Sequence, residues 1–315
     1  MNKVLEHGGT LAALRRAWPD APTPWLDLST GINPEPYPVP AKLPPGCLER
    51  LPEPDDVQAL EAVAARAFSV ADPRRVVAAP GTELLIDLLP RLFPADTVRV
   101  LGPTYAEHAR SWARAGAVTS ENGRAVVLCN PNNPDGLRRT PDEVLALADR
   151  DLLVVDEAFA DLEDGPLSIA AIDHPATVVL RSFGKTYGLA GVRLGFAVSS
   201  RARAAVIRAA LGPWAVSGPA IAIGLRALAD AGWLSASRAR LTDETVLLDT
   251  VLSGAVRVIG GTRLFRLTET DEAAVLHARL ASRGIAVRKF AEHPRWLRFG
   301  QPGAGLGRLA DALRR

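Results

Sequence analysis

The stretch RSFGKTYGLAGVRLG, residues 181 to 195, follows a short apolar run at 177 to 180 that is typical of a strand. Glycine recurs in it at 184, 188, 191 and 195, where it lets the backbone approach a bound group closely. Ser182, Lys185 and Arg193 add a hydroxyl group and two cations. This pattern predicts a site that holds a phosphorylated cofactor.

Lys185 is open to three interpretations. Gly184-Lys185-Thr186 matches the end of a P-loop, but that motif requires glycine where Val179 stands, so the spacing excludes it. A second interpretation makes Lys185 the Schiff-base lysine of pyridoxal phosphate, with Ser182 and Arg193 on the phosphate. The third, a solvated surface lysine, is weakened by composition, because only 4 of the 37 basic residues are lysine. Lysine can lose a proton and attack a carbonyl, which arginine cannot do.

The composition limits the classes of function. The net charge is +2 and the arginines are dispersed, so we expect no nucleic-acid partner. Two cysteines, far apart, exclude a disulfide framework, and the five histidines show no metal-ligand spacing, so we expect no metal. The N-terminus lacks an apolar signal core and no stretch is apolar enough to span a bilayer, so we expect a cytoplasmic protein without a membrane partner.

Strand-like runs alternate with helical patterns over much of the chain, which predicts a mostly parallel sheet with helices on both faces. Beyond about residue 231 the pattern changes to that of a smaller α+β domain. We therefore expect a large domain at 46–231, and a small one formed by 1–45 and 232–315. The expected strands of the large domain are 76–79, 98–101, 125–129, 152–156, 177–181 and 194–198, and its helices are 55–68, 83–92, 105–115, 141–149 and 201–211.

Candidate ligand-binding residues follow the expected strands, because ligands of such sheets lie beyond the carboxyl ends of the strands. Gly81-Thr82-Glu83 opens a helix whose first N–H groups could bind a phosphate, although Thr82 as a plain N-cap is an alternative. The ring of Tyr105 could stack on a cofactor. Asp156 ends an apolar strand, where burial requires a positive partner such as a protonated pyridine nitrogen. Asn133 lies in a segment that a simple turn would also explain.

Ser182-x-x-Lys185 followed by Gly-Leu-Ala-Gly-x-Arg-x-Gly resembles the cofactor-lysine segment of the fold-type I pyridoxal-phosphate enzymes. The resemblance is to the branch that contains histidinol-phosphate aminotransferases and threonine-phosphate decarboxylases, and it covers nearly the whole chain. It implies a homodimer with pyridoxal 5'-phosphate on Lys185. It also makes Asp156 the partner of the pyridine nitrogen and Asn133 a donor to the 3-oxygen of the cofactor.

The same resemblance implies roles for residues that are otherwise unremarkable. Arg298 would bind the substrate α-carboxylate, and Arg288 is a weaker candidate for the same anionic pocket; on the residues alone, an arginine at the rim explains Arg298 as well. His7 would help to hold a substrate phosphate and Asn33 would lie near the carboxylate. Without the resemblance, a terminal histidine is more simply solvent-exposed and inert.

Four features resemble the decarboxylases of this branch: His7-Gly8-Gly9, Ile32-Asn33-Pro34, Phe159 where the aminotransferases carry tyrosine, and Pro213-Trp214. They imply decarboxylation of L-threonine O-3-phosphate, a phosphorylated amino acid. Transamination of histidinol phosphate or a related amino acid is the alternative, and a non-catalytic cofactor-binding regulator is a third. Leu51 stands where relatives place a tyrosine that reaches the cofactor phosphate of the partner subunit, which puts that contact in doubt.

Overall fold

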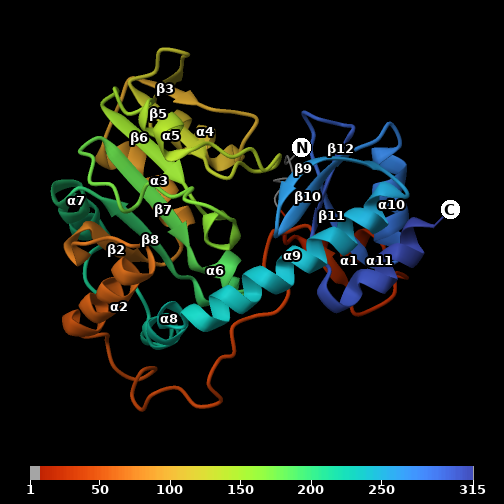
Figure 1. The fold of residues 1–315 in the computed structure, drawn as a ribbon, viewed down its shortest axis with the longest axis horizontal. Helices are drawn as coiled ribbons and strands as arrows, with labels where there is room; N and C mark the ends of the chain where they lie inside the picture. Colours follow the sequence, from red (N-terminus) through yellow and green to blue (C-terminus); the bar gives the residue numbers. More distant parts are fainter. Residues whose placement is uncertain (1–7, 315) are drawn as a thin grey trace. The chain divides into compact units, whose positions relative to one another are not determined.

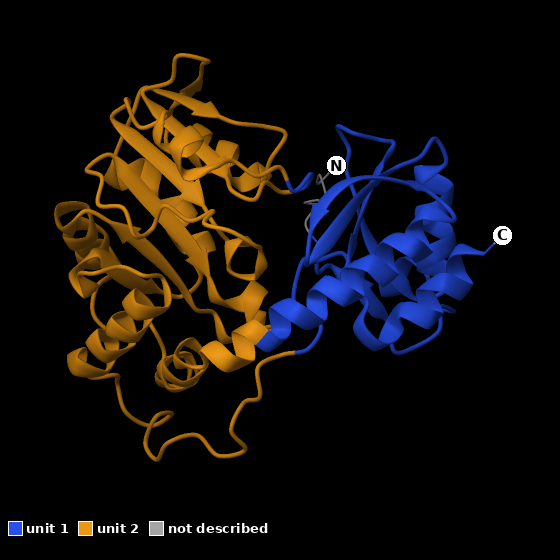
Figure 2. Cartoon of the chain, in the orientation of Figure 1, with its two compact units in different colours: residues 1–35, 134–136, 236–315 blue, residues 36–133, 137–235 orange. Residues whose placement is uncertain are grey.

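The computed structural model describes residues 8 to 314, which form two compact units (Figures 1 and 2). Unit 1 comprises Met1–Glu35, Pro134–Gly136 and Ala236–Arg315, and unit 2 comprises Pro36–Asn133 and Leu137–Ser235. Within residues 8 to 314, no helix has both the length and the apolar character needed to cross a bilayer.

Unit 2 is built on a seven-stranded sheet in the order β2-β8-β7-β6-β5-β3-β4. Strands β3, β4, β5, β6 and β7 run parallel, while β8 is antiparallel to both of its neighbours, β2 and β7. The strands are β2 (Val76–Ala79), β3 (Thr97–Val100), β4 (Val118–Thr119), β5 (Ala125–Cys129), β6 (Leu152–Asp156), β7 (Thr177–Ser182) and β8 (Gly195–Ser199). The expected mostly parallel sheet is confirmed.

Helices cover both faces of this sheet. Successive apolar side chains of β6 point to opposite faces, so each face needs a covering layer. Leu153 and Val155 point into a core shared with α2 and α8, whereas Leu152 and Val154 point into a second core shared with α3, α4 and α7. All five residues of β6 are therefore buried. The helices are α2 (Pro54–Ala67), α3 (Thr82–Leu92), α4 (Ala106–Arg114), α5 (Pro141–Leu145), α6 (Phe183–Thr186), α7 (Arg201–Leu211) and α8 (Gly218–Ala229).

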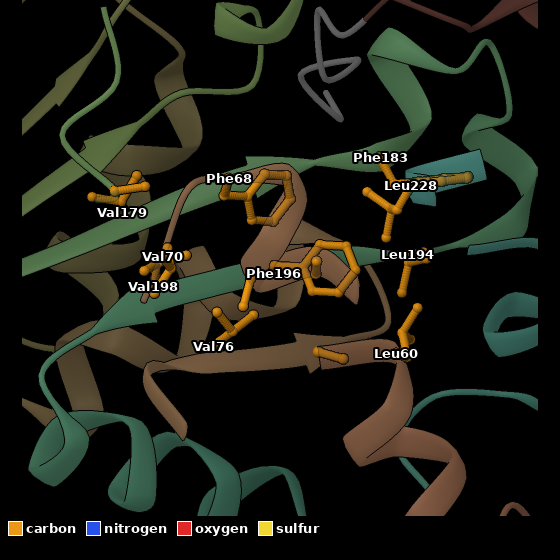
Figure 3. Packing of buried hydrophobic residues seen from close by; sticks show 14 of the residues in the cluster. Leu60, Phe68, Val70, Val76, Val179, Phe183, Leu194, Phe196, Val198 and Leu228 are labelled. Atoms are coloured by element: carbon orange, nitrogen blue, oxygen red, sulfur yellow. The ribbon is translucent and has the colours of Figure 1, made fainter. Parts of the chain in front are cut away.

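The first of these cores is organised around two aromatic rings (Figure 3). Phe196 of β8 is fully buried, and its ring meets that of Phe68 edge to face at 5.5 Å between centroids. Leu60 of α2 and Leu194, which precedes β8, lie beside them and are also buried. Burial of such side chains supplies about 1.5–3 kcal/mol each, and it fixes the strands whose ends carry the candidate site.

Unit 1 contains a five-stranded sheet in the order β1-β11-β12-β10-β9, in which β1 pairs parallel with β11 and the other pairs are antiparallel. Phe299 and Leu297 of β12 lie in its core, packed with residues of α9, α10 and α11. Its elements are α1 (Leu11–Ala17), β1 (Leu26–Leu28), α9 (Ala231–Ser253, which begins in unit 2), β9 (Arg257–Thr262), β10 (Phe265–Glu269), α10 (Ala273–Ser282), β11 (Ile285–Lys289), β12 (Trp296–Gly300) and α11 (Leu306–Leu313).

Candidate active site

Asp156 and its neighbours lie where the central parallel strands of unit 2 end. Asp156 is the last residue of β6 and stands in register with Cys129, the last residue of β5. Only 6% of Asp156 is exposed, and its Oδ1 accepts a hydrogen bond from the Ala158 N–H at 3.0 Å. Its Oδ2 lies 3.0 Å from Nε2 of His108, a buried residue of α4. Two hydrogen bonds thus fix the direction of this carboxylate, and a carboxylate is a suitable partner for a cationic ring nitrogen.

His108 is a residue that the sequence analysis missed. Burial alone would lower its pKa, but the neighbouring Cys129 and Asp156 outweigh burial and raise the pKa to about 10. The imidazole is therefore a cation at neutral pH and donates to Asp156. The buried face of α4, which carries Glu107, Ser111 and Trp112 with His108, is the signal that could have identified it.

The ligand atoms of His108, Cys129 and Asp156 lie within 4.8 Å of one another, a donor set that a metal ion could use. Sequence spacing gave no hint of this grouping, because the three residues come from α4, β5 and β6. The short His108–Asp156 hydrogen bond pairs two of the three groups directly, and we interpret the cluster as hydrogen-bonded support for the Asp156 carboxylate. The absence of a metal stays a prediction.

Lys185 lies in the single-turn helix α6, directly after the end of β7. Its Nζ is 5.8 Å from the centroid of the Phe159 ring, within the range of a cation–π contact. A Cβ at Gly184 would lie 2.7 Å from the Ala190 Cα, so α6 can pack against the following segment only with glycine there. The glycine-rich character of the stretch thus serves the packing of the turn that carries Lys185.

A buried network of charges fixes the far side of the same turn. Arg181 of β7 donates to Glu157 Oε2 at 2.7 Å and also pairs with Asp161. Asp161 in turn accepts from the Thr186 hydroxyl at 3.0 Å, next to Lys185 in the chain. Burial raises the pKa of Glu157, and Arg181 opposes that rise. The network holds α6 against the loop that follows β6.

Arg193 and the start of α3 form a cradle for an anion. The N-cap of α3 is Gly81, with φ of +92°, and a Cβ there would lie 2.7 Å from Nη2 of Arg193. A Cβ at Gly195 would lie 2.7 Å from the Thr82 backbone nitrogen. Because Gly81 occupies the N-cap position, Thr82 is the first residue of α3 and not its N-cap. No side chain caps this helix. Its first N–H groups and a guanidinium are available together, which suits a phosphate.

Tyr105 and Glu83 lie at the starts of two neighbouring helices of unit 2. The Tyr105 hydroxyl donates to Glu83 Oε2 at 3.0 Å, and its ring meets that of His108 edge-on at 6.0 Å. Burial, followed by the charge of Glu83, raises the pKa of Tyr105, so its hydroxyl stays protonated. The structure thereby connects Tyr105 to Asp156 through His108.

Of the asparagines after β5, two have structural hydrogen bonds and one is a candidate for binding the cofactor. Asn130 exchanges hydrogen bonds with the backbone of Arg139, both at 2.9 Å, and Asn132 donates to the Pro103 carbonyl at 2.9 Å. Both therefore fix the turn itself. Asn133 is 8% exposed, and its predicted contact with the cofactor stays a prediction. Ser182 ends β7 as the N-cap residue of α6 without a side-chain capping bond.

Pyridoxal phosphate fits the residues of unit 2 by the chemistry of its donors. The cradle at Gly81, Thr82 and Arg193 suits its phosphate, and the Asp156 carboxylate suits a protonated pyridine nitrogen. Lys185 supplies the amine that the aldehyde requires. Parallel strand ends and the turns that follow them carry these groups, as in other open α/β sheets.

The candidate substrate residues lie in unit 1. Arg298 of β12 is 3% exposed, so it is not an arginine at the rim, and its Nη2 donates to the Ser29 carbonyl at 2.8 Å. Burial, followed by the charge of Arg288, lowers its pKa, and Asp27 partly offsets this. Arg288 stands opposite Arg298 in the β11–β12 pairing. Two cations so placed favour an anionic ligand. Asn33 is also buried, whereas His7 lies outside the described residues.

Leu51 and Trp214 are exposed by 62% and 56%. Trp214, with φ of +63°, lines a largely apolar cavity of about 590 Å³ between α2 and α7 within unit 2.

The fold and this site define a class of protein. The family model for aminotransferase class I and II matches residues 118–313, and the chain belongs to that family. Within it, the chain is 43% identical to a threonine-phosphate decarboxylase of Sinorhizobium sp, over 100% of this chain and 99% of that protein. It is 40% identical to the threonine-phosphate decarboxylase of Pseudomonas aeruginosa, over 98% and 97% of the two chains.

A comparison with solved structures supports the architecture. The crystal structure of histidinol-phosphate aminotransferase from Sinorhizobium meliloti in complex with pyridoxal-5'-phosphate superposes with a TM-score of 0.82. The match covers 96% of this chain and 93% of that one at 22% identity, so it speaks for the fold alone.

Proposed function

We propose that this protein catalyses the decarboxylation of L-threonine O-3-phosphate to (R)-1-aminopropan-2-yl phosphate, a side-chain precursor in cobalamin biosynthesis. The observation that carries the proposal is the full-length identity of 43% with a protein named for this reaction. Phe159 beside Lys185 supports it, because it lacks the hydroxyl that the aminotransferases of this branch present at that position.

Pyridoxal phosphate is the cofactor of the proposed reaction, and the residues of unit 2 hold it. Lys185 would supply the amine for its aldehyde, and Arg193, Ser182 and the start of α3 at Gly81 and Thr82 would hold its phosphate. The Tyr105 ring would face its pyridine, and Asn133 would donate to its 3-oxygen. The bound cofactor supplies an electron-accepting ring for the electron pair left at Cα when CO2 departs.

Two residues of the chain, Asp156 and Lys185, have further roles in the proposed reaction. Asp156, hydrogen-bonded to the cationic His108 at 3.0 Å, would pair its carboxylate with the pyridine nitrogen and so favour a proton there. The substrate amino group would take the place of Lys185 on the cofactor and so release Nζ as an amine. Once the carboxylate has left as CO2, Cα requires a proton, and this Nζ would deliver it. The amine then regains a proton from solvent, so atoms and charge balance over the cycle.

The substrate carries two anionic groups that need separate partners. We assign the α-carboxylate to Arg298 and Asn33, with Arg288 in the same pocket, and the phosphate to His7. Bidentate pairing with a guanidinium fixes a carboxylate in direction as well as position. Direction matters because the bond at Cα that stands perpendicular to the cofactor ring is the one that breaks, and this decides between decarboxylation and transamination.

We infer that the protein acts as a cytoplasmic homodimer. The inference on assembly is supported by large apolar side chains exposed on unit 2, since Leu48 and Leu51 are 77% and 62% exposed and Trp214 is 56% exposed. Exposed apolar groups of this size are typical of protein–protein interfaces.

The decisive experiment is incubation of the purified, cofactor-loaded protein with L-threonine O-3-phosphate while CO2 and the visible spectrum of the cofactor are followed. Release of CO2 over many turnovers with an unchanged final spectrum is the expected result. Conversion of the cofactor to its amine form without CO2, with this substrate or with histidinol phosphate, would make the protein an aminotransferase. Binding without either reaction would support the regulator instead.

A further inference from the structure

Asn33 lies in the turn that follows β1, and its side chain is held by two donors. The residue is 1% exposed. Its Oδ1 accepts from the Glu35 backbone N–H at 3.1 Å and from Nη2 of Arg240, in α9, at 2.8 Å. Asn33, Glu35 and Arg240 all belong to unit 1.

These two contacts determine which way the amide of Asn33 faces. A backbone N–H and a guanidinium can only donate, so the atom that meets them is the carbonyl oxygen and not the nitrogen. The NH2 group consequently occupies the other edge of the amide, where it can only donate. Because its oxygen faces Arg240 and the Glu35 N–H, the amide can offer a ligand only N–H donors, and donors suit an anion.

Arg240 is itself fixed from two directions. Its Nε pairs with Glu35 Oε2 at 3.0 Å, and its Nη1 pairs with Glu244 Oε1, one turn along α9, at 2.7 Å. Each of the three guanidinium nitrogens thus has an acceptor, namely Glu35, Glu244 or Asn33, which leaves the group little rotational freedom. The Asn33 amide, which accepts from this guanidinium, is therefore also held in one orientation.

The turn that carries Asn33 runs beside the segment that carries Arg298. Arg298 donates to the Ser29 carbonyl at 2.8 Å. A Cβ at Gly300 would lie 2.2 Å from the Thr30 oxygen, and one at Gly303 would lie 3.0 Å from Cβ of Pro34. Backbone approach this close requires glycine, and it aligns the turn with the end of β12.

We propose that Arg240 is a positioning residue, which holds the amide of Asn33 so that its NH2 group donates to the substrate carboxylate. The inference rests on the proposed function, in which Asn33 and Arg298 meet that carboxylate. Its specific consequence is that Arg240, which does not touch substrate, contributes to the binding of ligands with a carboxylate and not to the binding of ligands without one.

Two unreactive ligands that differ only in the carboxylate test this consequence. They are 3-(phosphonooxy)butanoate, which is the substrate without its amino group, and propan-2-yl phosphate, which lacks the carboxylate as well. Neither carries the amine that the reaction requires, so their dissociation constants can be measured by calorimetry on the cofactor-loaded protein without turnover.

The variants are Arg240→Met and Asn33→Asp. Arg240→Met removes the guanidinium, and Asn33→Asp keeps the acceptor for Arg240 while it replaces the donor edge with a second oxygen. Arg266→Met is the control, because Arg266 pairs with Asp249 of α9 at 2.7 Å in the same unit but does not contact Asn33. If Arg240→Met does not fold, Asn33→Asp, which is nearly isosteric, still tests the inference.

We expect Arg240→Met and Asn33→Asp each to weaken 3-(phosphonooxy)butanoate about tenfold or more, and propan-2-yl phosphate less than about twofold. Arg266→Met should change neither constant. Equal losses for the two ligands, or no loss for either, would overturn the role of Arg240 and leave the proposed function standing. Wild-type protein that binds neither ligand and releases no CO2 would overturn both.

Discussion

Asp156 is almost completely buried, and both of its carboxylate oxygens have hydrogen-bond partners. One partner is the cationic His108 and the other is the Ala158 N–H. The sequence pointed to Asp156 because a charged residue at the end of an apolar strand requires a partner. It did not point to His108, since the partner comes from a helix whose position is set only by tertiary packing.

We expect Asp156→Asn to retain the cofactor but to lower kcat roughly a hundredfold, the scale on which active-site charges act. The amide can still bond with His108 but no longer favours a proton on the pyridine nitrogen. Steady-state CO2 release and the cofactor absorbance measure the two effects separately. Asp151→Asn is the control, because Asp151 forms an exposed ion pair with Arg124. Turnover close to wild type in Asp156→Asn would remove its assigned role.

His108 predicts a dependence of stability on pH. Its pKa is about 10 in the folded protein and 6.5 in the unfolded chain. A pKa raised by folding stabilises the folded state fully below pH 6.5, and this contribution is lost as pH rises to about 10. The difference in free energy of unfolding between wild type and His108→Gln should therefore shrink over that interval. Denaturant titrations at several pH values measure it, and a difference that is constant with pH would mean that His108 is neutral in the fold.

At the scale of elements, the strands of unit 2 were predictable because each is a short apolar run bounded by turn residues. The structure confirms β2, β5 and β6 with the expected bounds. Strands β1 and β4 were missed, since β1 gains its place only by pairing with β11, and β4 has two exposed residues. The sequence around Lys185 gave no sign of a helix, whereas the structure forms the one-turn α6 there, packed against the segment at Ala190.

The role of the anion cradle at the start of α3 can be tested with two glycine positions that share the same backbone conformation. Gly81 and Gly116 have the same φ of +92°, but a Cβ at Gly81 would lie 2.7 Å from the Arg193 guanidinium, whereas one at Gly116 meets nothing within 4 Å. Alanine at either position therefore costs backbone strain, about 1–3 kcal/mol. Only Gly81→Ala should also displace Arg193 from the cradle.

We expect Gly81→Ala to weaken binding of pyridoxal phosphate about tenfold or more, which corresponds to about 1.4 kcal/mol. Gly116→Ala should lose stability but keep its cofactor affinity. The dissociation constant follows from titration of the apoprotein, and the denaturation midpoint gives the strain. Equal cofactor affinities in the two variants would show that the cradle does not bind the phosphate.

At the scale of the whole molecule, the sequence predicted the fold class because βα alternation and the Lys185 stretch lie in the chain itself. Side-chain groupings such as Arg240 with Asn33 could not be predicted, since their members are 207 positions apart and share no motif. The proposed homodimer likewise depends on surfaces, which no motif in the sequence marks. Leu51 is one large apolar side chain on such a surface, with 62% of it exposed.

The assembly can be tested at that position. If the loop before α2 lies in the subunit interface, Leu51→Glu buries an unpaired charge there and should raise the dimer dissociation constant at least a hundredfold, because an uncompensated buried charge costs about 3–5 kcal/mol. Val275→Glu is the control, since Val275 is 66% exposed on α10 of unit 1. Sedimentation velocity across a range of concentrations measures both variants. A dimer that Leu51→Glu leaves intact would place the interface elsewhere, and a wild-type monomer that turns over substrate would show that one chain supplies the complete site.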